Sequence, residues 1–272
     1  MSLRSSLKDA KDALLVSMKN WRLWLVQFAG NAVLFAGFLW WLQIPEAHWW
    51  QLGFQLVLLI AIGIGALLLH GGTLNYFLSA HQQKEALLAP AFRKALRHVP
   101  AIAVWAVVFF LLRELIGRLD HYSVSFPGYF RSGFPAWLRR MISEPALDNI
   151  YIGFVALLRW IILPGLLLPF ALFAADRGVR GLVALGDWGR TIRSLAYWLL
   201  LFVASILGVY CIGLIMGWTM DPKTATLPGE RASLVFRMLL AYLLGIFAWF
   251  LACSMLGRRQ LRSAGQSVAQ PE

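Results

Sequence analysis

Charged residues are scarce in this chain of 272 residues, and cysteine is nearly absent. Asp, Glu, Lys and Arg make up 14% of the sequence, against about 25% in an average globular protein, and 60% of the residues are hydrophobic. A water-soluble fold is therefore excluded, because so few charges leave too much apolar surface in contact with water. Cys211 and Cys253 both lie in apolar stretches, which argues against a disulfide framework and against a zinc site.

Known catalytic signatures are also missing. The sequence contains no His-Glu-x-x-His, no Gly-x-Ser-x-Gly, no phosphate-binding loop ending in Gly-Lys-Ser/Thr and no pair of neighbouring cysteines. We therefore assign no catalytic, cofactor-binding or metal-binding residue and expect no cofactor. These absences weigh against an enzyme.

Long apolar stretches are what the chain has in abundance. The hydrocarbon core of a bilayer is about 30 Å thick, and about 20 helical residues cross it. Windows of that length mark six spans, near residues 23–43, 52–70, 102–117, 151–175, 195–217 and 234–256. The third is the shortest, so a tilted or partly interfacial segment, with five full spans, is the alternative. The sequence predicts an all-α, polytopic transmembrane helical bundle, with a single domain at 1–257 and a disordered cytoplasmic tail at 258–272.

Basic residues are distributed unevenly between the gaps. Sixteen of the 25 Lys and Arg residues fall in the amino-terminal arm, the second and fourth gaps and the tail, whereas the first gap has none. Because cytoplasmic loops are enriched in Lys and Arg, both termini are predicted to lie in the cytoplasm. This excess also accounts for most of the net charge of +12. We therefore expect anionic lipid headgroups, and no nucleic acid, as the partner of the basic surface.

The stretches before the odd-numbered spans have apolar residues at helical spacing and basic residues on the opposite face. The apolar positions are Leu3, Leu7, Ala10, Leu14 and Met18, then Leu88, Phe92, Leu96 and Val99, then Val179, Leu182, Val183, Trp188 and Ile192. Such helices lie along the headgroup region of a membrane, and a plain extension of the following span is the alternative. The repeated plan predicts three helical hairpins, at 1–80, 81–176 and 177–257.

One of these stretches carries a family resemblance. The segment from Gly181 to Phe202 resembles the amphipathic stretch repeated in bacterial six-helix proteins similar to the membrane domain of glycerophosphodiester phosphodiesterases. The segment from Asp12 to Trp24 shows the same pattern more faintly. The resemblance implies the hairpin plan and a bacterial inner-membrane location. It assigns no site residue.

Two charged positions inside the predicted spans stand out, because a charge in lipid is costly unless it is paired, hydrated or able to reach the surface. Arg159 lies eight residues past Tyr151, hence about 12 Å deep at 1.5 Å per residue. Glu114 reaches the same outer third of the membrane from the opposite direction. We expect Glu114 and Arg159 to pair between adjacent helices. The alternative is that Arg159 extends alone to the outer phosphates.

Pro164, Gly165 and Pro169 fall near the centre of the fourth span. Proline lacks the N–H that continues a helix, so a kink or break is expected there. Irregular backbone at that depth is tolerated only where protein or water satisfies it. With Arg159 about one turn away, this segment is the predicted functional element, a lateral groove or a hinge.

The inner end of the second span contains the sequence His-Gly-Gly-Thr-Leu-Asn, from His70 to Asn75. The two glycines allow a neighbouring helix to approach closely. We expect a hydrogen-bonded packing role for His70, and a polar pocket lined by His70 and Asn75 at the inner face is the alternative.

The function classes can be weighed against these features. Ion-coupled transporters have ionisable groups at the bilayer centre, and intramembrane enzymes need a nucleophile, base or metal set at one depth. Apart from Arg159, the predicted spans offer neither. The sequence favours a non-enzymatic integral inner-membrane protein, a scaffold that organises lipids or partner proteins, including a second copy of itself. A permease, or a component that translocates lipids or small molecules, is the alternative.

A charge swap tests the expected pair. Glu114→Gln and Arg159→Gln should each lower the yield of folded protein several-fold, because each leaves one charge unpaired in lipid. The double variant Glu114→Arg with Arg159→Glu should restore the yield, measured as the monodisperse fraction in size-exclusion chromatography. Arg140→Gln, outside the spans, is the control, and a swap that restores nothing contradicts the pairing.

Overall fold

The computed structural model describes residues 11–12, 15–45, 47–82, 87–122, 125–218 and 226–268, nearly all helical and with no strand among them. Six stretches are long and apolar enough to cross a membrane: Trp21–Gln43, Trp49–Ala80, Val99–Gly117, Glu144–Arg177, Leu195–Gly217 and Leu227–Gly257. The predicted all-α polytopic bundle is confirmed. Only 6–11% of the most apolar window is buried in the first three stretches, against 56% in the sixth, so the sixth is the central helix.

The helices follow the three predicted hairpins. The first consists of α2 (Trp21–Gln43) and α3 (Trp49–Gln82). The second consists of α4 (Leu88–Arg97), α5 (Val99–Gly117), the 3-10 helix η1 (Arg118–Tyr122), α6 (Ser125–Ser132), α7 (Ala136–Met141), α8 (Glu144–Leu157), the π-helix η2 (Leu158–Ile162) and α9 (Leu163–Arg177). The third consists of α10 (Val179–Leu182), α11 (Leu185–Ile192), α12 (Leu195–Ser205), the π-helix η3 (Ile206–Cys211), α13 (Ile212–Gly217) and α14 (Leu227–Val268).

Two of the three predicted amphipathic helices are present within the described residues. α4 precedes the third span and is separated from α5 by a break at His98, so it is not a plain extension of that span. α10 and α11 precede the fifth span. Residues 15–19 before the first span are helical, whereas Leu3, Leu7, Ala10 and Leu14 lie outside the described residues. The position of these helices at a membrane surface stays a prediction.

α14 continues as helix to Val268, which differs from the irregular tail predicted from residue 258. The sequence there, Arg-Arg-Gln-Leu-Arg-Ser-Ala, contains good helix formers and no proline, so the last span can extend without a break. The helix therefore reaches well past the apolar window that ends at Gly257.

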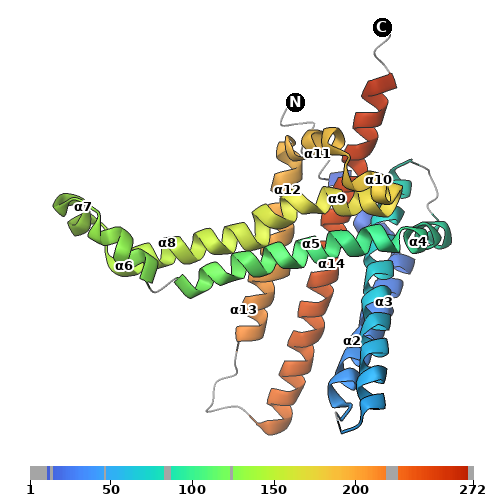
Figure 1. Ribbon diagram of the computed structural model, residues 1–272, viewed down its shortest axis with the longest axis horizontal. Coiled ribbons are helices and arrows are strands. Elements are labelled where there is room, and N and C mark those ends of the chain that lie inside the picture. The colour runs from blue at the N-terminus through green and yellow to red at the C-terminus, as the bar shows by residue number, and fades with distance from the viewer. Residues whose placement is uncertain are drawn as a thin grey trace.

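The long helices run in two directions (Figure 1). α2, α3, α12–α13 and α14 run roughly alongside one another, whereas α5 and α8–α9 run across them and carry α6 and α7 away from the other hairpins. The third and fourth spans are thus both strongly inclined to the helices of the first and third hairpins. α4, α10 and α11 lie toward the end of the bundle opposite the α2–α3 turn.

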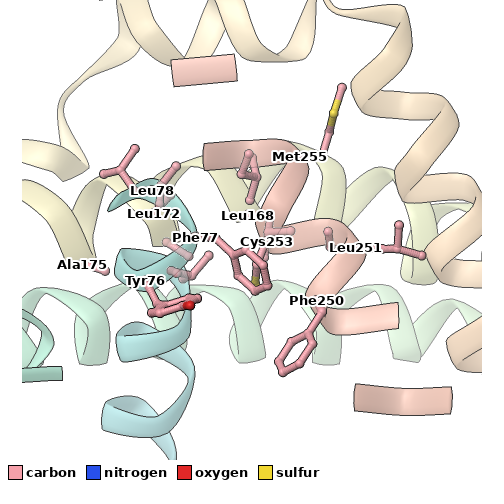
Figure 2. Close-up of a cluster of buried hydrophobic side chains, with 14 of the residues drawn as sticks. Tyr76, Phe77, Leu78, Leu168, Leu172, Ala175, Phe250, Leu251, Cys253 and Met255 are labelled. Atoms are coloured by element: carbon pink, nitrogen blue, oxygen red, sulfur yellow. The ribbon is translucent and has the colours of Figure 1, made fainter. Parts of the chain in front are cut away.

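The core lies where α3, α9 and α14 meet (Figure 2). Phe77 of α3, Leu172 of α9 and Phe250 of α14 are at most 1% exposed, and the rings of Phe77 and Phe250 are 5.5 Å apart, edge to face. A Cβ on Gly257 would lie 2.7 Å from the carbonyl oxygen of Phe77, so the α14 backbone touches the α3 backbone. Close backbone contact of this kind stabilises helix association in lipid. Lipid tails are as apolar as the helix surfaces, so there is no hydrophobic driving force between helices.

A buried amide joins the two helices of the first hairpin. The Gln27 side chain is fully buried, and its Nε2 donates to Thr73 Oγ1 at 2.5 Å and to the Leu69 carbonyl at 3.2 Å. Asn31 Nδ2 in turn donates to Gln27 Oε1 at 2.8 Å. These polar side chains therefore connect helices to one another.

The chain reverses sharply between α9 and α10. Gly178 has φ of +65°, a left-handed conformation that glycine adopts without strain. α10 then folds back against α9 so tightly that a Cβ on Gly181 would lie 2.0 Å from the Phe173 carbonyl oxygen. Only a residue without a side chain fits at position 181.

Gly181→Ala should lower the thermal unfolding midpoint in detergent, because α10 would have to move away from α9 and overpacking costs about 1–3 kcal/mol. Gly186→Ala in α11 is the matched control, since nothing lies within 4 Å of the added Cβ. That control should be neutral or stabilising, because alanine favours helix over glycine. Equal midpoints for the two variants would contradict the close contact.

Candidate functional site

Span four runs as one helix from Glu144 to Arg177, and its irregularity is a π-helical turn rather than a break. η2 is a π-helix, in which the Leu163 N–H bonds to the Leu158 carbonyl five residues earlier. Pro164 has no N–H for the carbonyl of Trp160, and Pro169 has none for the carbonyl of Gly165, each four residues earlier. In lipid, both oxygens need donors from elsewhere in the protein.

Hydroxyl groups of α12 supply both donors. Ser205 Oγ donates to the Trp160 carbonyl at 2.9 Å, and Tyr197 Oη donates to the Gly165 carbonyl at 2.8 Å. Tyr197 is only 1% exposed, so water does not compete for this bond. The two bonds tie the fourth span to the fifth at the positions where the prolines interrupt the helix.

Two indole groups bond to the next carbonyls of the same turn. Trp188 Nε1 of α11 donates to the Leu166 carbonyl at 2.7 Å, and Trp105 Nε1 of α5 donates to the Leu167 carbonyl at 2.8 Å. We call this set the span-four bracket. It consists of the carbonyls of Trp160, Gly165, Leu166 and Leu167 and their donors Ser205, Tyr197, Trp188 and Trp105.

Gly165 is required by close packing within the bracket. A Cβ at this position would lie 2.3 Å from Cζ3 of Trp198 and 2.9 Å from Leu201. The missing side chain lets the Trp198 ring cover the α9 backbone, while Trp198 Nε1 donates to the Ile192 carbonyl at 2.6 Å. Pro164, Gly165 and Pro169 thus lie in one closely packed junction.

Arg159 lies at the outer side of this junction. Its Cζ is 5.7 Å from the Trp160 ring, and Cζ of Arg113 on α5 is 5.5 Å from the same ring, so the indole interacts with two guanidinium groups. A guanidinium nitrogen of Arg159 is near Gly117, where an added Cβ would lie 3.9 Å away. Arg159 therefore reaches the outer end of the helix that carries Glu114.

Glu114 itself is exposed on α5. The ion pairs found among the described side chains join Lys94, Arg177 and Arg190 to Asp176 and Asp187, and Arg131 to Glu144. The expected bond between Glu114 and Arg159 stays a prediction, which the charge swap tests.

His70 and Asn75 face different neighbours. The His70 ring packs edge-on against Trp249 of α14, with centroids 5.2 Å apart. Asn75 Nδ2 donates to the Ala175 carbonyl of α9 at 2.9 Å, and Asn75 also lines a cavity of about 190 Å³ with Ser79 and Lys94. Asn75 therefore belongs to a polar cavity, whereas His70 contacts the central helix.

No group of three or more His, Cys, Asp or Glu side chains that could hold a metal ion occurs in the described part of the chain. Comparison with known proteins found no matching family, no similar characterised protein and no similar solved structure. The resemblance of residues 181–202 to six-helix membrane domains stays a prediction. The chemistry of this chain has to be argued from its own side chains.

The hydrogen-bond donors of the bracket could not be identified from the sequence. The two prolines indicate that free carbonyls exist, but Tyr197 and Ser205 lie 32 and 45 residues from their acceptors. Nothing in a single sequence distinguishes these hydroxyls from others in the same span.

A double-mutant cycle tests the bracket. Tyr197→Phe should cost about 1 kcal/mol of stability, because it leaves the Gly165 carbonyl without a donor. In a Pro169→Ala background the new N–H can bond to that carbonyl, so the same Tyr197→Phe change should cost much less. Unfolding is measured in detergent, with the exposed Tyr210→Phe as control. A cost of Tyr197→Phe that is unchanged by the proline background would contradict this role.

Proposed function

We propose that this chain is a non-enzymatic, multi-pass protein of the bacterial inner membrane, with both termini in the cytoplasm, which acts as a scaffold that organises lipids or partner membrane proteins. The observation that carries the proposal is the span-four bracket. It makes a rigid junction from which the outer part of the second hairpin projects, and a rigid projecting surface is what a scaffold requires.

The projecting part, which we call the arm, comprises the outer half of α5 with η1, α6, α7 and α8. Among them, η1, α6 and α8 contact chiefly one another, α5 and η2. Large apolar side chains on the arm are exposed, including Leu111 (65%) and Leu115 (60%) on α5 and Ile150 (63%) on α8. In a membrane such a surface faces lipid or another protein, and it does not enclose a transport pathway.

The bracket also bears on the alternative function. Broken helices in transporters present free backbone carbonyls and helix ends to an ion or substrate. Here protein donors occupy the carbonyls of Trp160, Gly165, Leu166 and Leu167. A junction whose carbonyls are already hydrogen-bonded within the protein supports a static role better than the role of a gate that opens and closes.

A permease remains the second candidate because of one specific observation. Span four contains the π-helix η2 and span five the π-helix η3, Ser205 directly before η3 bonds to Trp160 of η2, and Arg159 is within η2. π-Helices occur frequently at functional sites. Solute flux that depends on Arg159 would favour this candidate.

Photo-crosslinking from the arm tests the proposal. A crosslinking residue in place of Ile152, which is 55% exposed on α8, should capture lipid and one reproducible membrane protein in native membranes. The same residue in place of Val155, 2% exposed on the same helix, is the matched control and should give only intramolecular products. Purified protein in liposomes should add no solute flux above protein-free vesicles.

Three results would overturn the scaffold. Equal products from both positions would mean that the arm is no contact surface. Substrate-dependent flux that Arg159→Gln abolishes would replace the scaffold with a permease, and turnover of a lipid headgroup would replace it with an enzyme.

A further inference from the structure

A basic cavity on α4 is not used by the span-four bracket. It measures about 520 Å³ and is lined by Ala89, Pro90, Arg93, Lys94, Arg97 and His98. α4 lies toward the same end of the bundle as α10 and α11 (Figure 1), the end for which the sequence predicts a cytoplasmic location. Four of the six lining residues carry nitrogen donors that suit an anion.

The cavity belongs to a fixed surface. Ala91 and Ala95, on the inner face of α4, are 5% and 0% exposed. The Phe92 ring lies against Gly72 of α3, where an added Cβ would be 2.7 Å from the ring. Lys94 forms an ion pair with Asp176 at the end of α9, so α4 is held from two sides.

The ion pairs found among the described residues at this end of the bundle do not include the two arginines of α4. Asp176 is shared by Lys94 and Arg177, and Asp187 by Arg177 and Arg190. Arg93 and Arg97 take part in none of the ion pairs found among the described residues. They are exposed and four residues apart, so both guanidinium groups lie on one face of α4.

His98 fixes the carboxyl end of α4. Its Nδ1 lies 2.8 Å from the Ala175 carbonyl oxygen, and because a carbonyl can only accept, Nδ1 carries a proton and donates it to α9. The anion-binding groups of the cavity are therefore the two guanidinium forks of Arg93 and Arg97, and a guanidinium fork matches the oxygens of a phosphate group.

A second cavity adjoins the first and shares Pro90 and Lys94 with it. Its other lining residues are partly polar, through Asn75 and Ser79, and partly apolar. Leu87 and Leu96, at the two ends of α4, are 65% and 57% exposed. A membrane phospholipid has a phosphate group, polar esters next to it and apolar chains beyond the esters. These three parts match the basic cavity, the partly polar second cavity and the exposed leucines.

We propose that the α4 cavity is a binding site for a phosphate ester, with Arg93 and Arg97 as its ligands, and that the exposed leucines favour an ester carried by an anionic membrane lipid. This inference rests on the proposed lipid-organising function and deepens it, because it names the lipid class and the residues that bind it. The same chemistry occurs in soluble phosphate esters, and the experiment separates the two sources.

The test uses the full chain in detergent and native mass spectrometry. Phosphatidylglycerol should bind at least tenfold more tightly than phosphatidylcholine. Arg93→Gln with Arg97→Gln should weaken phosphatidylglycerol binding about 30-fold, because each basic residue near a membrane surface contributes about 1 kcal/mol and about 1.4 kcal/mol is a factor of ten. Arg139→Gln with Arg140→Gln on α7 is the matched control, which removes the same charge from two exposed arginines and should leave binding unchanged.

Each outcome decides a separate point. Loss of binding in the α4 variant alone supports the site, and partial rescue by Arg93→Lys with Arg97→Lys shows that charge, rather than a folding defect, is responsible. Competition by glycerol phosphate as strong as by the lipid would support the phosphate site and assign it to a soluble ester. Equal loss in both double variants, or none in the α4 variant, would overturn it. Solute flux would defeat the scaffold while leaving these binding results unchanged, so the two proposals can fail separately.

Discussion

Lipid offers no hydrogen-bond donor to the backbone, and the carbonyls around Pro164 and Pro169 lie where the fourth span is interrupted. The molecule bonds the Trp160 and Gly165 carbonyls to hydroxyl groups of α12, and indole groups of α11 and α5 bond to the carbonyls of Leu166 and Leu167. Each of these helices must then stay within hydrogen-bonding distance of α9. The crossing of the second hairpin over the third is therefore held by specific bonds in addition to packing.

The two ends of the second hairpin differ as a result. Its inner end is fastened by the bracket, by the core contacts of Leu172 and by the ion pair between Lys94 and Asp176. Its outer end, the arm, leaves large apolar side chains such as Leu111 exposed. The first end is therefore held by specific contacts, whereas the second presents apolar surface together with exposed charged residues such as Arg118, Arg139 and Arg140.

Some of this could be predicted residue by residue. The prolines indicate irregular backbone, and the structure has a π-helix from Leu158 to Ile162, just before Pro164. The depth argument places Arg159 in the outer third, and its guanidinium is found beside Gly117 of the same helix as Glu114. His70 and Asn75 do not line a common pocket, because residues five positions apart on one helix face different neighbours. A helical pattern shows which residues share a face, and it contains no information on which helix that face meets.

The length and hydropathy of each segment determined by themselves that the chain is helical, that six stretches suit a bilayer and where the helices break, because these are properties of one segment and its solvent. The tertiary structure decided the direction of the second hairpin, the four donors of the bracket and the docking of α4 against α3 and α9. Those features depend on contacts between segments far apart in the chain. In lipid, helices are matched by close packing and hydrogen bonds rather than by hydrophobicity, so hydropathy alone does not specify partners.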